Sequence, residues 1–189
     1  SVQLLSEHGR PSDHEKRLLA IVLRESERLN GLITDFLAYA RPVPPRKERF
    51  NLYQMLMDLQ SLLHADSRFE KIALQVQVPE EFLVWADRDQ LQQVLLNLLH
   101  NAADAMPDGG EVSLQAGIQP VSAAAGGAAA LYLKVLDQGT GLDEETCQHL
   151  FEPFWTTISN GTGLGLATVL RIMEGHGGFG EAETRKGGG

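Results

Sequence analysis

The stretch Phe151-Glu-Pro-Phe-Trp-Thr-Thr-Ile-Ser-Asn-Gly-Thr-Gly-Leu-Gly-Leu-Ala-Thr168 decides how the rest of this chain is interpreted. It passes from an aromatic–proline corner through small polar residues to three glycines at alternate positions, Gly161, Gly163 and Gly165, and continues as an amphipathic helix. Glycines in a loop that leads into a helix let the backbone approach a ligand closely, and the helix start offers unpaired N–H groups to an anion. The stretch therefore predicts a phosphate-binding loop. The alternative is a flexible turn before a surface helix.

The composition is that of a soluble globular protein with one main core. Of the 189 residues, 43% are hydrophobic and 22% are charged, and the formal net charge is -9. This acidic total argues against nucleic acid as a partner, because such a partner needs a basic face, but it allows a phosphate ligand that a metal ion neutralises. The single cysteine, Cys147, excludes an internal disulfide and suits a reducing compartment. We expect a cytoplasmic chain; a parent held in the inner membrane through missing upstream segments would look the same here.

Residues 1–43 predict a helical domain. Ser1 to Glu7 has the character of the tail of a helix whose beginning is missing, and a second helix is expected from Asp13 to about Arg41. Its apolar positions alternate in steps of four and three, which is a heptad seam. The seam consists of Leu18, Val22, Glu25, Leu29, Leu32, Phe36 and Tyr39, with Glu25 as the odd member. Other helices must cover such a face, so we expect a dimeric four-helix bundle, with packing onto the rest of the chain as the alternative.

The proline-rich stretch Arg41-Pro-Val-Pro-Pro45 is expected to form a stiff linker, and residues 44–189 predict an α+β domain. Helices are expected after Asn51, from Asp87 to about Met106, from Glu144 to Leu150 and after Gly165, and strands are expected at 72–78, 82–85, 112–118, 131–136 and from Phe179. The strand at 82–85 is expected to pair with the strand at 72–78. Together these elements predict one mixed sheet with helices on a single face.

Two asparagines stand out in the helix that follows Asp87. Asn97 and Asn101 are four residues apart, so they project from one face of the helix, beside an apolar stripe that forms the core. Asparagine is a poor helix former, and a buried one needs a polar partner. The pair therefore indicates a lined pocket, in which a side-chain carbonyl is a suitable ligand for Mg²⁺. Two asparagines that face solvent are the alternative.

Asp137-Gln-Gly-Thr-Gly141 lies at the end of a predicted strand. A carboxylate at that point can accept a hydrogen bond from an exocyclic amine, which favours adenine over guanine. Gly139 and Gly141 remove side chains that would obstruct a flat base. A tight turn in which the aspartate caps its own backbone explains the pattern equally well.

In this order along the chain, the three features resemble the sensor histidine kinases of two-component systems. Asn97-Leu-Leu-His-Asn-Ala-Ala-Asp-Ala105 is similar to their asparagine box, 137–141 to the first glycine box, 151–154 to the phenylalanine box and 161–165 to the second glycine box. The short lid with Thr156-Thr157 is similar to that of the nitrogen-regulation type. Because 24–30 and 35–42 resemble the second helix of the dimerisation domain, the resemblance covers nearly the whole chain.

The resemblance implies a Bergerat-type (GHKL) two-layer α/β sandwich, preceded by the remnant of a helical dimerisation hairpin. It implies a homodimer that binds Mg-ATP, phosphorylates a histidine and passes the phosphoryl group to an aspartate of a response regulator. Asn101 would bind Mg²⁺, Asn97 would lie near the phosphates and Asp137 would recognise adenine. The residues implied around ATP are, in full, Asn97, Asn101, Asp137, Gly139, Gly141, Phe154, Thr156, Thr157, Gly161, Thr162, Gly163, Leu164 and Gly165.

Some positions depart from the family pattern. The acceptor histidine is expected in His-Glu-x-x-Asn-Pro, which this sequence lacks; His14-Glu15 has no Asn-Pro after it. The other five histidines have no matching context and are expected on helix surfaces or in loops. Ile158 stands where short-lid kinases usually place a lysine, and Gly180 stands where the family prefers an apolar residue.

Two alternative functions remain at this stage. One is an ATP hydrolase of the same superfamily, such as the gyrase B or mismatch-repair ATPases. Those enzymes place a glutamate base one turn before the magnesium asparagine, where this chain has Asn97, a poor base. The other is a nucleotide-regulated dimerisation module without kinase activity.

Overall fold

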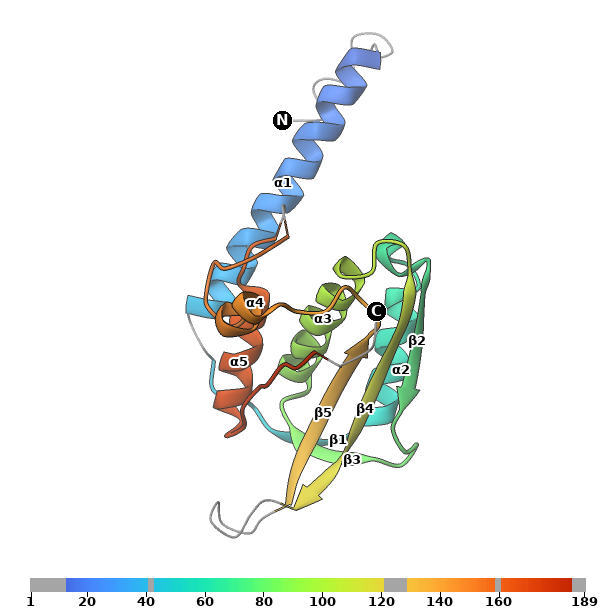
Figure 1. The fold of residues 1–189 in the computed structure, drawn as a ribbon, viewed down its shortest axis with the longest axis vertical. Coiled ribbons are helices and arrows are strands. Elements are labelled where there is room, and N and C mark those ends of the chain that lie inside the picture. Colours follow the sequence, from blue (N-terminus) through green and yellow to red (C-terminus); the bar gives the residue numbers. More distant parts are fainter. Residues whose placement is uncertain (1–12, 41–42, 121–128, 159–160, 185–189) are drawn as a thin grey trace. The chain divides into compact units, whose positions relative to one another are not determined.

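The computed structural model describes residues 13–40, 43–120, 129–158 and 161–184. The chain divides into two compact units, Ser1–Arg41 and Pro42–Gly189. In the first unit, helix α1 spans Asp13–Ala40 (Figure 1). The helix tail predicted at residues 1–7 lies outside the described residues.

Helix α1 carries many exposed apolar side chains, and Leu18, Val22, Leu29 and Phe36 of the predicted seam are among them. The exposed large apolar side chains of α1 are Leu18, Ile21, Val22, Leu23, Leu29, Ile33, Phe36 and Leu37. The side chains of Leu32 and Tyr39, two members of the predicted seam, lie outside the description. No helix in the described ranges is both long enough and apolar enough to span a membrane.

The second unit alternates helices and strands. Its elements are β1 (Glu48–Asn51), α2 (Leu52–Leu63), the 3-10 turn η2 (Ser67–Phe69), β2 (Ile72–Gln77), β3 (Leu83–Ala86), α3 (Arg88–Asp104), β4 (Gly110–Pro120), β5 (Ala129–Asp137), α4 (Glu144–His149) and α5 (Gly165–Gly175). The side chains of Asn51, Asp87 and Asp143 accept backbone N–H groups at the starts of α2, α3 and α4. Such caps satisfy donors that have no partner inside the helix. The predicted helices of this unit are therefore confirmed.

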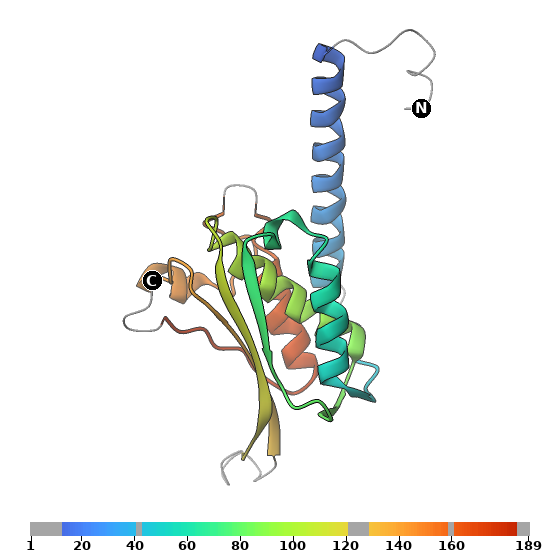
Figure 2. The same ribbon diagram turned by 90° about the vertical axis from the view of Figure 1, so that its right-hand side faces the viewer.

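The main sheet is mixed. Strand β2 runs parallel to β4, which is antiparallel to β5. Helices α2 and α3 cover one face of this sheet, and α5 packs against α3 (Figures 1 and 2). This is the two-layer α+β sandwich that the sequence predicts.

Two predicted details of the strands are wrong. Strand β3 pairs with β1, antiparallel, and not with β2. The pairing is fixed where α2 begins, because the N–H of Leu52 donates to the carbonyl of Phe82 at 2.9 Å. The strand expected from Phe179 is also absent, since 179–184 have no regular structure.

The core lies between the helices and the sheet. It is built from leucines and Met55 of α2, leucines and alanines of α3 and the inward-facing residues of β4. In β4, Val112, Leu114 and Ala116 are buried, but Ile118 on the same face is exposed. The apolar faces predicted for these three elements are largely the buried ones, but Leu62 of α2 and Ile118 of β4 are exposed, and Leu98 of α3 is half-buried beside the fully buried Leu99.

Replacing Leu56 with alanine should lower the free energy of unfolding by about 2–5 kcal/mol, because the side chain is 1% exposed and its removal leaves a cavity. Leu62 of the same helix is 57% exposed and serves as the matched control. Leu62→Ala should change stability by less than about 0.5 kcal/mol. Urea unfolding of the two variants measures the difference, and equal losses would contradict this core.

Candidate functional site

One face of α3 contacts both glycine loops. Asn97, Asn101 and Ala105 succeed one another by one helical turn. The side-chain Nδ2 of Asn97 donates to the carbonyl of Gly165, at the start of α5, at 3.1 Å. At the other end, a Cβ added to Gly139 would lie 2.7 Å from the Cβ of Ala105, so only glycine fits beside the helix. Asn101 therefore lies one turn from each loop.

Asn101 has the properties of a ligand residue. It is half-buried, and its side chain makes no hydrogen bond within the described residues. Among the described residues its amide atoms do not count as buried atoms without a partner, so the amide reaches solvent and is open to a ligand. The described part of the chain holds no cluster of three His, Cys, Asp or Glu side chains that could bind a metal. The amide oxygen of Asn101 nevertheless fits Mg²⁺, which takes few protein ligands and retains waters.

The loop after β5 is a turn closed by its own aspartate. Oδ1 of Asp137 accepts the N–H of Gly139 at 2.9 Å. The side chain is exposed, and its second oxygen makes no hydrogen bond within the described ranges. Gly141 has φ +74°, and the hydroxyl of Thr184 accepts the next N–H, that of Leu142, at 3.0 Å. The capped turn considered for the sequence is thus present, and it leaves one carboxylate oxygen available to a ligand.

The phenylalanine corner and the second glycine loop are joined through their backbones. The N–H of Phe154 donates to the carbonyl of Gly163 at 2.8 Å. Both residues have positive φ, 67° and 65°, which is uncommon for phenylalanine. A Cβ on Gly163 would lie 2.4 Å from the carbonyl carbon of Phe154. The Phe154 side chain is 64% exposed.

The short lid is folded on Thr156. Its hydroxyl accepts the N–H of Ile158 at 3.1 Å, and the Ile158 carbonyl accepts the N–H of Gly161 at 2.9 Å. A Cβ on Gly161 would meet the same hydroxyl at 2.6 Å. Thr157 is exposed and makes no hydrogen bond to the described residues. The backbone of Ile158 therefore supports the lid, although its side chain carries no charge.

The second glycine loop is anchored by Leu164, which is 1% exposed. The N–H of Leu164 donates to the hydroxyl of Thr162 at 3.2 Å. Helix α5 begins at Gly165 without a side-chain cap. Within the described ranges the N–H groups of Gly163 and Gly165 have no hydrogen-bond partner, whereas those of Gly161 and Leu164 are engaged. Two of the five predicted donors are therefore committed to the loop itself.

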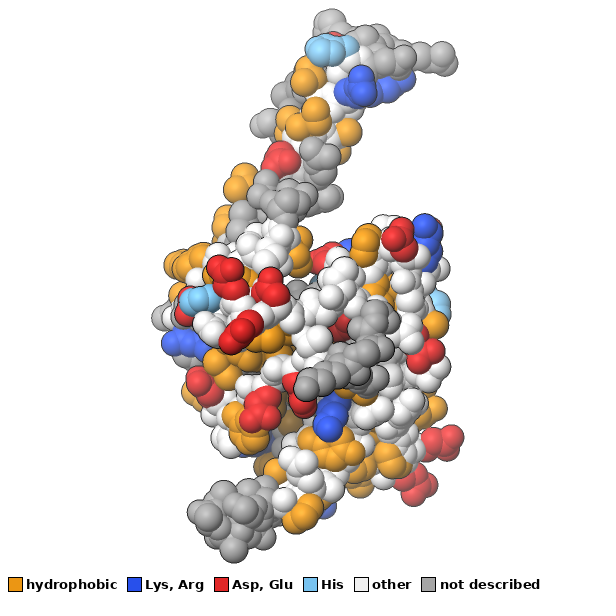
Figure 3. Space-filling model, in the orientation of Figure 1, with side chains coloured by type: hydrophobic (Ala, Val, Ile, Leu, Met, Phe, Trp, Pro, Cys, Tyr) orange, Lys and Arg blue, Asp and Glu red, His pale blue; other side chains and the backbone are white. Residues whose placement is uncertain are grey.

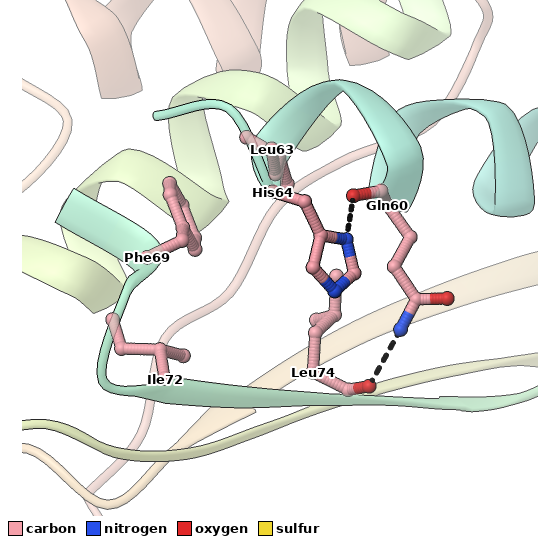
Figure 4. A pocket seen from close by; sticks show the side chains of 6 residues that line it. All are labelled: Gln60, Leu63, His64, Phe69, Ile72 and Leu74. Carbon is pink, nitrogen blue, oxygen red and sulfur yellow. Dashed lines mark hydrogen bonds between the residues drawn. The ribbon is translucent and has the colours of Figure 1, made fainter. Parts of the chain in front are cut away.

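Two cavities lie elsewhere in the domain. A small one, of ≈ 30 Å³, lies between α2 and β2, where His64 and Gln60 face Leu74 (Figure 4). A larger cleft of ≈ 360 Å³ borders the C-terminal end of α3, with Arg68, Lys71 and Asp104 in its wall. Neither contains a residue predicted to bind the nucleotide.

The surface over α4 is acidic (Figure 3), with Glu144 and Glu145 in its first turn. A phosphate ligand near that surface would depend on N–H groups and a cation.

The sequence interpretation missed His176. It was expected on a helix surface or in a loop, but the ring is half-buried at the end of α5 and accepts the N–H of Asp87 at 3.1 Å. Burial alone would raise the pKa of the Asp87 carboxyl, but the N–H donors of Gln90 and Arg46 hold that pKa below its usual value. The only signal in the sequence is Gly175-His-Gly-Gly178, in which glycines surround the histidine.

Comparison with known proteins places this geometry in a family. Residues 86–189 match the model described as histidine kinase-, DNA gyrase B-, and HSP90-like ATPase. The chain is 35% identical over 179 residues to the sensor histidine kinase ZraS of Klebsiella oxytoca, covering 94% of this chain and 37% of that protein. It is 31% identical over 187 residues to the sensory histidine kinase/phosphatase NtrB of Rhizobium meliloti, covering 92% and 48%.

A solved structure agrees with these relatives. Histidine kinase ThkA in complex with the response regulator protein TrrA matches 99% of this chain and 52% of its own chain, with a TM-score of 0.72 and 25% identity. The chain spans less than half the length of the two curated relatives. It belongs to the family of histidine kinase-, DNA gyrase B- and HSP90-like ATPases, and within that family it contains the catalytic domain of a sensor histidine kinase.

Proposed function

We propose that this chain is the kinase core of a two-component sensor: it binds Mg-ATP, and the γ-phosphoryl group passes to a histidine and then to a response-regulator aspartate. The observation that carries the proposal is the face of α3, which joins the two glycine loops, with the Asn101 side chain between them making no hydrogen bond to the part of the chain that the structure describes. The supporting relatives are named sensor histidine kinases.

The proposed roles of these residues follow from the hydrogen-bond donors and acceptors that the described residues leave unused. The second carboxylate oxygen of Asp137 accepts the exocyclic amine of adenine, and Gly139 lets the turn that holds Asp137 pack directly against Ala105 at the end of α3. The unengaged N–H groups of Gly163 and Gly165 donate to the phosphates at the start of α5. Phosphoryl transfer requires mainly positioning and charge stabilisation, so this domain needs no base of its own.

Asn101 would hold the magnesium ion through its side-chain oxygen. When bound, the ion neutralises charge on the phosphates. Asn97 keeps α3 against Gly165 through its amide N–H, and its oxygen faces the same loop, within 4.0 Å of a Cβ built on Gly165. Because an amide is not a base, Asn97 cannot activate water, and this favours transfer to a histidine over hydrolysis.

We propose that the acceptor histidine lies outside residues 1–189. None of the six histidines is followed by Glu-x-x-Asn-Pro. His14 is exposed in the first turn of α1 and has no Asn-Pro after it. Residues 1–43 would form the dimerisation part and 44–189 the ATP-binding part. The exposed seam residues Leu18, Val22, Leu29 and Phe36 of α1 support a homodimer, because a four-helix bundle would bury them.

The full protein is proposed to pair with a response-regulator receiver domain; ThkA, a structural relative, is seen with such a regulator. No nucleic acid is proposed as a partner, because the net charge is -9. The chain itself is proposed to lie in the cytoplasm, and only segments outside it would reach a membrane.

Calorimetry with Mg-ATP, Mg-GTP and metal-free ATP tests this function. We expect the chain to bind Mg-ATP, to prefer it to Mg-GTP and to phosphorylate an added helical bundle that carries the acceptor histidine. Asn101→Ala should remove the gain in affinity that Mg²⁺ provides, roughly tenfold for one charge-assisted contact. Asp104→Ala, an exposed change on the next turn of α3, is the control. Failure to bind Mg-ATP would refute the proposal, and sustained phosphate release would favour the hydrolase.

A further inference from the structure

The imidazole of His176 uses both of its nitrogens. Nε2 accepts the backbone N–H of Asp87 at 3.1 Å, and Nδ1 lies 2.9 Å from the carbonyl of Ile172, one turn back along α5. Because Nε2 is an acceptor, Nδ1 must carry the proton and donate to that carbonyl. The ring therefore acts in its neutral form and joins two helices.

The end of α5 holds this ring in place. Gly177 has φ +82°, and its N–H donates to the carbonyl of Glu174 at 2.9 Å, while the N–H of Gly178 donates to the carbonyl of Met173 at 2.8 Å. These two bonds form a Schellman motif, which ends a helix with a left-handed glycine. His176 is the last residue before that glycine, so its backbone is fixed on both sides.

Asp87 is the residue that caps α3. Its Oδ1 accepts the N–H of Gln90 at 3.0 Å, so the contact with His176 attaches the beginning of α3 to the end of α5. Asn97 attaches the same helix to Gly165, at the beginning of α5. The two helices are therefore joined at both ends of α5, once by an asparagine of the proposed site and once by His176.

The segment from Pro45 to Lys47, where the linker ends, closes the same junction. Oδ2 of Asp87 accepts the N–H of Arg46 at 2.7 Å, and Nζ of Lys47 donates to the carbonyl of His176 at 3.1 Å. A Cβ on Gly175 would lie 3.8 Å from Cδ of Pro45, so the linker also packs against the last turn of α5. The junction thus consists of the linker, the cap of α3 and the end of α5.

We propose that His176 is a positioning residue for the triphosphate, fixing the orientation of α5 and through it the N–H groups of Gly163 and Gly165. This inference rests on the proposed function. The base site is built on α3 and the turn after β5, without α5. Loss of the junction should therefore weaken contacts to the phosphates and leave contacts to the base.

The test compares His176→Phe with His64→Phe. His64 also follows a helix and has Nδ1 2.7 Å from the carbonyl four residues back, but it makes no hydrogen bond to another helix within the described residues (Figure 4). At a temperature where both variants are fully folded, His176→Phe should weaken Mg-ATP binding by roughly five- to tenfold, the effect of about one hydrogen bond and its alignment. Adenosine binding should change less than about twofold, and His64→Phe should change neither. His176→Gln, whose amide both donates and accepts, should restore part of the affinity.

Two results would overturn the proposal: equal losses for adenosine and Mg-ATP, which a purely structural role predicts, or no loss for either. Should wild-type protein fail to bind Mg-ATP at all, the proposed function itself is refuted, and this outcome differs from both results above.

A second measurement needs no variant. Because coupling is reciprocal, Mg-ATP should slow hydrogen exchange at the amide of Asp87 in the wild-type chain, whereas adenosine should not. Unchanged exchange with saturating Mg-ATP would overturn the proposal.

Discussion

Gly163→Ala is expected to abolish measurable Mg-ATP binding while most of the domain remains folded. The added methyl would lie 2.4 Å from the carbonyl carbon of Phe154, which is a backbone atom that cannot rotate away. The phenylalanine corner and the glycine loop must then separate, and the N–H groups of Gly163 and Gly165 lose their alignment. Two bonds to charged phosphate oxygens, at about 1.5–3 kcal/mol each, correspond to roughly a 100-fold loss or more.

Gly177→Ala is the matched control for Gly163→Ala. Gly177 also has positive φ, +82°, but a Cβ there would meet nothing within 4 Å, and alanine keeps the backbone N–H that donates to Glu174, so we expect the end of α5 and His176 to stay in place. Both variants carry the left-handed strain of about 1–2 kcal/mol, and only one carries the clash. We expect Gly177→Ala to lower the melting temperature and to keep Mg-ATP affinity within about fivefold of wild type, a ratio worth about 1 kcal/mol. Similar affinities for the two variants would mean that the Phe154–Gly163 contact does not organise the site.

Asp137→Asn should remove the preference for adenine and lower Mg-ATP affinity by roughly 10- to 100-fold, the range for a hydrogen bond to a charged group. The asparagine oxygen can still accept the N–H of Gly139, which Asp137 accepts at 2.9 Å, so the turn itself should persist. The other carboxylate oxygen becomes an NH₂ group, which repels the exocyclic amine of adenine and suits the carbonyl of guanine. Competition between Mg-ATP and Mg-GTP measures the change.

The control for this substitution is Asp143→Asn. Asp143 caps α4 in a similar way, with Oδ1 2.7 Å from the N–H of Thr146, and it is exposed. The change removes the same charge from the same region without touching the proposed base site. Asp143→Asn would reduce Mg-ATP affinity as much as Asp137→Asn does only if the total negative charge of this acidic surface sets the affinity. In that case Asp137 has no specific role in binding the base.

Local sequence patterns predicted much of this domain because the spacing of residues along a helix or strand determines which of them share a face. The steps of four in Asn97, Asn101 and Ala105 place one face toward both glycine loops, whatever lies elsewhere in the chain. The family resemblance carried by these motifs is confirmed by the ATPase match over residues 86–189 together with the similarity to sensor histidine kinases. The individual roles of the site residues remain predictions that the substitutions above test.

Long-range partners could not be predicted in the same way. The strand Glu48–Asn51 is short and lacks alternating polarity, so its residues do not predict the pairing with β3. His176 and Asp87 are separated by 89 positions, and a single histidine among glycines does not indicate which residue will be its hydrogen-bond partner. The positive φ of Phe154 is equally invisible, because phenylalanine rarely adopts that conformation.

The self-closed turn at Asp137 has a practical consequence for protein engineering. One oxygen of that side chain maintains the loop. On the proposed role of Asp137, the other oxygen selects the base, so we expect a single amide replacement to change the choice of purine and to leave the second glycine loop as it is. A sensor carrying such a replacement could be supplied with a synthetic triphosphate that the other kinases of a cell ignore. Its signalling could then be followed separately, with the remaining circuits unperturbed.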